Sequence, residues 1–101
     1  MKGATAVPLS VLEAVSDSLE LIELAAKKGN VNSLSDAGVG GLCARAAAEG
    51  AFYNVLINLA EVKDEKFVSK NRKKAEELLE KISQRTALVA SEIRTTLAEK
   101  L

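Results

Sequence analysis

Apolar residues recur at three- and four-residue intervals in three long segments, the spacing that gathers side chains on one face of an α-helix. The first segment runs from about Pro8 to Lys28. Pro8 suits a first helical turn, because the missing proline N–H has no helical partner there. Gly29 then predicts the C-terminal stop. The apolar stripe of this segment comprises Val11, Leu12, Val15, Leu19, Ile22 and Ala26.

A second helix is predicted to begin near Ser33 to Asp36 and to continue to about Glu61. The hydroxyl of Ser33 or Ser35 can accept a hydrogen bond from the first amides of a helix. Asp36 would then lie in the first turn, where a negative charge complements the helix dipole. The segment GNVNSLSDAGVGG, residues 29–41, is therefore predicted to be a turn followed by a helix start.

Small residues crowd the interior of this second helix. Each interior glycine costs about 0.5–1 kcal/mol relative to alanine. We expect close backbone approach by neighbouring helices to compensate for that cost. The small residues are Ala37, Gly38, Gly40, Gly41, Ala44, Ala46, Ala47, Ala48, Gly50 and Ala51.

A third helix is predicted from the N-cap Asp64 through Lys100. Its apolar positions recur at helical spacing between charged residues, and no strand alternation occurs anywhere in the chain. The fold class is therefore all-α, a bundle of about three long helices. A third helix of roughly 55 Å leaves apolar stripes that one chain cannot bury, so we expect a homo-oligomer or a partner chain. The third stripe comprises Ala75, Leu79, Ile82, Thr86, Val89, Ile93 and Leu97.

The composition argues against several kinds of functional site and indicates none. Apolar residues make up 48% of the 101 residues and aromatic residues only 3%, so the core must be aliphatic. The 14 basic and 14 acidic residues give a net charge of +0, which offers no electrostatic argument for binding nucleic acid. Histidine is absent and Cys43 is the single cysteine. We therefore expect no metal site, no disulfide and a reducing cytoplasm.

The second helix also admits a membrane interpretation. Between Ala37 and Ala60 the only charged residues are Arg45 and Glu49. Asn54 adds polarity, as does a second asparagine four residues later, and many residues are small. A buried helix of a bundle is favoured over a membrane span.

One face of the second helix carries the candidate site residues. Asp36 and Asn54 are separated by five helical turns, and Asn58 follows Asn54 by one more. Two interpretations remain open for the asparagines: hydrogen bonds to neighbouring helix backbones, or contact with a ligand. Asp36 is either a helix cap or a site residue. Arg45 and Glu49 are predicted to form an i,i+4 ion pair, and Cys43 to be a small core residue. The full face comprises Asp36, Gly40, Cys43, Ala47, Gly50, Asn54 and Asn58.

Several stretches taken together resemble the cyclodeaminase domain of the formiminotransferase-cyclodeaminase family, which includes bacterial methenyltetrahydrofolate cyclohydrolases. They are VPLSVLE, GNVNSLSDAGVGGLCARAA, GAFYNVLINL, KDEKF and RTALVASEI. The resemblance runs from about Lys2 to Lys81. It implies an all-helical, dimer-forming fold that binds a reduced folate, with a tetrahydrofolate derivative as substrate and no metal.

The resemblance covers only the second half of that domain, so residues 1–101 are expected to be its C-terminal half. The Gly-Gly-Gly-Ser segment and the catalytic aspartate of the family belong to the first half and have no counterpart here. We therefore assign no catalytic residue. We expect Asp36, Asn54, Asn58 and Ser35 to line the folate cleft from this side. The implied activity is that of a formimidoyltetrahydrofolate cyclodeaminase, a lyase of histidine degradation, inactive as a half-length chain. The alternatives are a cyclohydrolase and a non-catalytic oligomerisation module.

Overall fold

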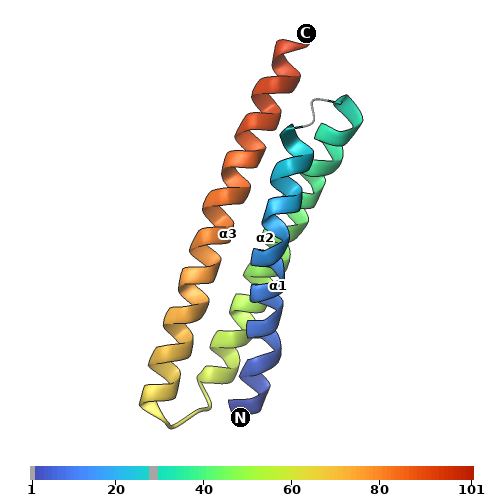
Figure 1. The fold of residues 1–101 in the computed structure, drawn as a ribbon. Coiled ribbons are helices and arrows are strands. Elements are labelled where there is room, and N and C mark those ends of the chain that lie inside the picture. The colour runs from blue at the N-terminus through green and yellow to red at the C-terminus, as the bar shows by residue number, and fades with distance from the viewer. Residues whose placement is uncertain (1, 28–29) are drawn as a thin grey trace.

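Three long helices lie side by side and run up, down and up again along a rod of 56 × 16 × 16 Å (Figure 1). The structure, a computed structural model, describes residues 2–27 and 30–101. Helix α1 spans Lys2–Lys27, α2 spans Val31–Leu59 and α3 spans Glu65–Glu99. All three pairs of helices are in contact. The predicted all-α bundle of three long helices is confirmed.

The first helix starts six residues earlier than its proline suggested. Pro8 lies inside α1 rather than in its first turn. The prediction from Pro8 was wrong because apolar residues before it, including Val7, extend the helical spacing towards the N-terminus. The predicted stop at Lys28 and Gly29 falls outside the described residues.

The second helix also begins earlier than predicted. Its N-cap is Asn30, whose Oδ1 accepts a hydrogen bond from the backbone N–H of Asn32 at 2.9 Å. The prediction of Ser33 or Ser35 as the cap was therefore wrong. Asp36 is the sixth residue of α2, beyond the first turn, so it does not cap the helix either. Asn30 is extended and directly precedes the helix, so its side-chain oxygen can accept from a free N–H of the first turn. Ser33 and Ser35 lie inside the helix and therefore cannot cap its start.

The third helix follows its prediction closely. Asp64 is the N-cap and its carboxylate accepts from the backbone N–H of Phe67 at 3.1 Å. The predicted stripe supplies all five buried residues of α3, namely Ala75, Ile82, Thr86, Val89 and Ile93.

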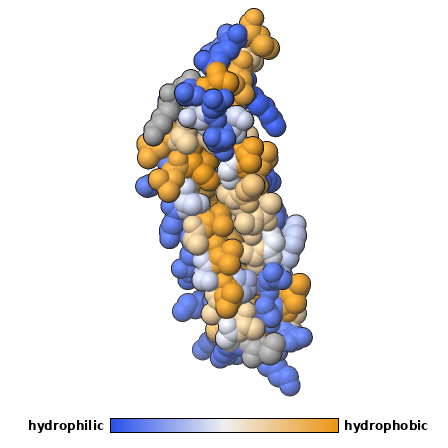
Figure 2. Space-filling view, turned by 90° about the vertical axis from the view of Figure 1, so that its right-hand side faces the viewer, coloured by the Kyte–Doolittle hydropathy of each residue, from blue (hydrophilic) through white to orange (hydrophobic). Residues whose placement is uncertain are grey.

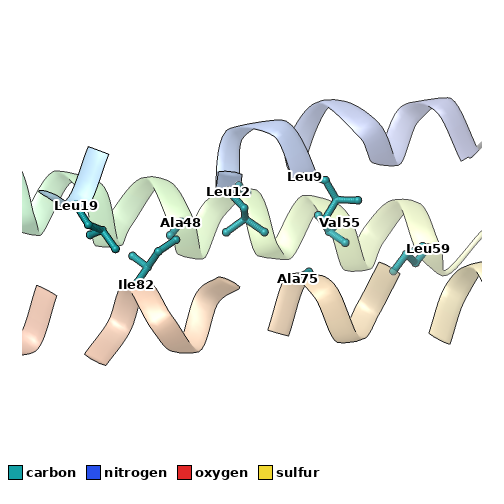
Figure 3. Close-up of a cluster of buried hydrophobic side chains, with 9 residues drawn as sticks. Leu9, Leu12, Leu19, Ala48, Val55, Leu59, Ala75 and Ile82 are labelled. Carbon is teal, nitrogen blue, oxygen red and sulfur yellow. The ribbon is translucent and has the colours of Figure 1, made fainter. Parts of the chain in front are cut away.

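The core is a narrow aliphatic column with two clusters along its length. The larger cluster joins α1, α2 and α3 around Leu12, Leu19, Val55 and Ile82 (Figure 3). The smaller one lies near the α1–α2 connection and comprises Leu34, Ala37, Val89 and Ile93. Alanines of α2 let the helices pack closely in both.

The glycines of α2 do not meet neighbouring backbones. A Cβ added to Gly38 would lie 3.6 Å from Ile93 Cδ1, and one at Gly41 would lie 4.0 Å from Ile22 Cγ2 and from Val89 Cγ1. These are ordinary van der Waals distances to side chains. The expectation that close backbone approach requires the glycines was therefore wrong.

Two further predictions for α2 fail. Cys43 is exposed and is not a core residue. Within the described residues, Arg45 and Glu49 form no ion pair. The core face of α2 is instead made of Leu34, Ala37, Gly41, Ala44, Ala48, Ala51, Val55 and Leu59.

Candidate functional site

A groove of about 520 Å³ lies on the surface between the N-terminal half of α1 and the C-terminal half of α2. Its lining is apolar and small except for two asparagine amides. That composition, an apolar floor with few polar groups, is typical of small-molecule sites. The lining residues are Ala4, Val7, Pro8, Val11, Ala47, Gly50, Ala51, Asn54 and Asn58.

Asn58 joins the two walls of the groove. Its Nδ2 donates to the carbonyl oxygen of Asn54 at 2.9 Å and to that of Ala4 at 3.3 Å. The Ala4 carbonyl needs a donor because the residue four positions later, Pro8, has no N–H. Asn58 therefore replaces the helical hydrogen bond that Pro8 removes. The interpretation of a hydrogen bond to a neighbouring helix backbone is confirmed for Asn58.

Asn54 differs from its neighbour one turn later. It is exposed, and within the described residues its side chain takes part in no hydrogen bond. Gly50 lies one turn before it, and no atom stands within 4 Å of a Cβ added there. The groove therefore has an open stretch of backbone beside an amide that is available to both donors and acceptors.

The other two predicted site residues lie away from this groove. Ser35 and Asp36 are exposed. Asp36 is 18 residues before Asn54 on the same helix, which is about 27 Å at 1.5 Å per residue. The structure thus brings Asn54 and Asn58 together and leaves Ser35 and Asp36 elsewhere.

The sequence analysis did not predict that residues of α1 line this groove. Ala4, Val7 and Pro8 line the groove, but a helix starting at Pro8 leaves the first two outside any element. The four-residue interval between Val7 and Val11 was the available signal, because it continues the helical spacing backwards past the proline.

The groove lining contains no carboxylate, no lysine and no hydroxyl, so it supplies no acid or base of its own. The ion pairs that join two helices lie elsewhere, between α1 and α3 or its N-cap. The Arg85 guanidinium donates from Nε to Glu23 Oε2 at 2.9 Å and holds the pKa of Glu23 below its usual value. Lys2 similarly lowers the pKa of Asp64. These contacts join α1 to α3 and take no part in the groove.

Neither metal binding nor membrane insertion finds support in residues 2–27 and 30–101. No three side chains of the metal-ligating types cluster there. None of the helices in that part of the chain is both long and apolar enough to cross a bilayer.

Comparison with known proteins gives consistent matches over most of the chain. The formiminotransferase-cyclodeaminase family profile matches residues 1–77. A formimidoyltransferase-cyclodeaminase from Rattus norvegicus is 36% identical over 89 residues, which is 88% of this chain and 16% of that protein. A methenyltetrahydrofolate cyclohydrolase from Methylorubrum extorquens is 39% identical over 79 residues, or 78% of this chain and 38% of that protein. The chain thus spans less than half the length of these relatives.

Proposed function

The chain belongs to the formiminotransferase-cyclodeaminase family, and from this premise we propose that it serves folate-dependent one-carbon metabolism by binding a reduced folate. The proposed reaction is that of a formimidoyltetrahydrofolate cyclodeaminase. In this reaction the formimino carbon, carried on a pterin ring nitrogen, forms a bond to the amine nitrogen of the p-aminobenzoyl group, and the bond to the imino nitrogen breaks, which releases ammonia and leaves methenyltetrahydrofolate. We place it in cytoplasmic histidine degradation.

The groove between α1 and α2 is the observation that supports this proposal. A pterin is flat and carries N–H and C=O groups along its edge, so it matches an apolar floor with one amide at its rim. Val7, Val11 and Ala47 supply apolar lining, and the amide is that of Asn54. Asn58 already donates within the protein, so its role in the proposal is to hold the two walls together.

The groove binds but does not catalyse by itself. Ring closure moves protons at a carbon between two nitrogens, which needs a group such as a carboxylate. The groove lining has none. We propose that this group comes from the first half of the domain, as a separate partner or a preceding segment, and that the chain alone is inactive.

The cyclohydrolase reaction is the second candidate. The relative from Methylorubrum extorquens carries that name and is as similar to the chain as the cyclodeaminases are. A cyclohydrolase opens the methenyl ring with water and gives formyltetrahydrofolate. Both reactions use the same pterin and the same bridging carbon, so the same groove serves either.

Folate binding is the direct test. Tetrahydrofolate is titrated into the chain and into Asn54→Ala by calorimetry. Asn32→Ala is the matched control, because it is the same exposed residue type on the same helix, about 33 Å away. We expect Asn54→Ala to weaken binding by about 2- to 12-fold, the effect of one lost hydrogen bond, and Asn32→Ala to leave it unchanged. Equal affinities for all three proteins would remove the groove from consideration.

Activity is tested in the presence of the missing half. Formimidoyltetrahydrofolate is offered to the chain alone and to the chain mixed with a first-half polypeptide of the family, while methenyltetrahydrofolate absorbance is followed. The proposal requires turnover in the mixture only. Ammonia release from formimidoyltetrahydrofolate identifies the cyclodeaminase. When methenyltetrahydrofolate is offered instead, loss of its absorbance faster than without protein identifies the cyclohydrolase.

A further inference from the structure

In the part of the chain that the structure describes, two arginines lack a carboxylate partner, and both line the same groove. Arg72 and Arg85 are each paired with a glutamate, whereas Arg45 and Arg94 form no ion pair. Arg45 comes from α2 and Arg94 from α3, and a groove of about 220 Å³ between these helices, the arginine groove, brings them together. Its lining comprises Gly38, Gly41, Leu42, Arg45, Thr86, Ala87, Val89, Ala90 and Arg94.

Neither arginine is neutralised by a neighbour on its own helix. Arg94 has alanine four residues before and after it on α3, and serine and leucine at the three-residue intervals. Glu49 follows Arg45 by four residues, but it interacts with Tyr53, whose pKa it raises through a side-chain hydrogen bond and its negative charge. Both guanidiniums therefore remain available to an anion from outside the chain.

The arginine groove lies on a different flank of α2 from the groove proposed for folate. Positions 38, 41 and 45 are about half a helical turn away from positions 47, 50 and 54. Figure 2 shows one side of the rod on which apolar side chains (orange and tan) extend along its length, with hydrophilic ones gathered at the edges and ends. An apolar surface of that kind offers an anion few charged partners, whereas the arginine groove offers two.

We propose that the arginine groove binds a small organic dicarboxylate, with one carboxylate on each guanidinium and a short hydrocarbon chain between them. This proposal is independent of folate binding. The planar fork of arginine matches a carboxylate through two parallel hydrogen bonds. Two cations beside a lining of small and apolar residues therefore favour a molecule that is charged at both ends and apolar in the middle.

The size of the groove limits the ligand. Sites for drug-sized molecules have volumes of about 300–1,000 Å³, and the arginine groove is smaller, at about 220 Å³. Apart from the two arginines, the lining contains no charged residue, and its one hydroxyl is in use, because Thr86 Oγ1 donates to the Ile82 carbonyl at 2.7 Å. The two guanidiniums are thus the groups that hold the ligand.

A phosphate group matches this lining less well than a dicarboxylate. Phosphate sites in proteins commonly use free backbone N–H groups at a helix N-terminus or in a turn. Helix α2 begins at Val31 and α3 at Glu65, so the lining from Gly38 and from Thr86 onward belongs to helix interiors. Backbone N–H groups there are already bonded within the helix.

Binding is tested by titrating succinate, glutarate and adipate separately into the isotope-labelled chain and following backbone amide shifts by NMR. The ionic strength is held constant, because salt screens exposed charges. We expect the amides of Gly38 and Gly41 to shift and that of Gly50, on the other flank of α2, to stay in place. Arg45→Gln and Arg94→Gln should each weaken binding of the tightest of the three by about 10-fold or more, the effect of a lost charged hydrogen bond.

Arg72→Gln is the matched control, because Arg72 is an exposed arginine of α3 outside the arginine groove. It should leave the affinity unchanged, and circular dichroism checks that all three variants stay helical. Pentanoate, which has the chain length of glutarate and a single carboxylate, should bind the parent about 10-fold more weakly than glutarate. That difference should disappear in Arg94→Gln, where only one guanidinium remains.

Three results would overturn the proposal. The first is the absence of any amide shift at about 10 mM of each dicarboxylate. The second is an equal loss of affinity in Arg72→Gln and Arg94→Gln, which would indicate a general effect of positive charge. The third is inorganic phosphate or pentanoate binding as tightly as the best dicarboxylate, which would show that the two arginines do not act on two separate carboxylates.

Discussion

Gly41 lies in the core face of α2, yet the structure leaves room there for a methyl group. A Cβ at this position would lie 4.0 Å from both Ile22 Cγ2 and Val89 Cγ1, an ordinary contact distance. A groove of about 220 Å³ between α2 and α3 adjoins the same position. Gly41→Ala should therefore stabilise the protein rather than strain it.

The size of the effect follows from two contributions. Replacing a helix-interior glycine by alanine stabilises by about 0.5–1 kcal/mol. Burying the added methyl contributes about 0.8 kcal/mol more. The sum is about 1–2 kcal/mol, which for a domain of this size raises Tm by about 4–16 °C.

Urea and thermal unfolding followed by circular dichroism measure this change at one fixed protein concentration, because association alters apparent stability. Gly41→Val is the control for space. Its γ carbons extend about 1.5 Å beyond Cβ towards Ile22 and Val89, so overpacking should cost about 1–3 kcal/mol. A Gly41→Ala protein that is less stable than the parent would mean that the helices approach more closely than the structure shows.

Three other changes test the packing and the ion pairs. Leu12 is fully buried between all three helices, so Leu12→Ala should lower the free energy of unfolding by about 2–5 kcal/mol, measured by urea unfolding; a smaller loss would indicate a looser core. The Thr5 hydroxyl is buried without a hydrogen-bond partner among the described residues, so Thr5→Val should stabilise by about 1–3 kcal/mol. A destabilised Thr5→Val would reveal a partner for that hydroxyl. Because Arg85 lowers the pKa of Glu23 below its usual 4.5, this pair stabilises the fold above that pH and is lost as the pH falls through the lowered pKa. Glu23→Gln should flatten that part of the urea-midpoint profile between neutral pH and about pH 3, and an unchanged slope would contradict the role of the pair.

Local sequence signals determined much of the fold. The third helix was predicted almost to the residue, because Asp64 is a strong cap and Ala75, Ile82 and Val89 recur at one spacing. The starts of the other two helices were missed. At Pro8 and at Ser33, a plausible local start signal lay inside a longer helix, and an earlier local signal, the spacing through Val7 or the cap Asn30, set the start instead.

The sequence predicted part of the candidate site as well. Asn54 and Asn58 could be identified from their i,i+4 spacing, but their roles could not, because both have the same side chain on the same face. Asn58 is used within the protein only because α1 brings the Ala4 carbonyl, left free by Pro8, to within 3.3 Å of it. That contact joins residues 54 positions apart, which no local pattern encodes.

Periodicity and capping residues therefore determined that the chain forms three long helices, since both act within one or two turns of the backbone. Only the tertiary structure decided which of the two apolar faces of α2 is buried. Its inner face, centred on Ala44 and Ala48, packs against α1 and α3, while Leu42 and Tyr53 remain exposed. A helix that is apolar all round offers no internal preference, so the choice depends on which face fits its neighbours most closely.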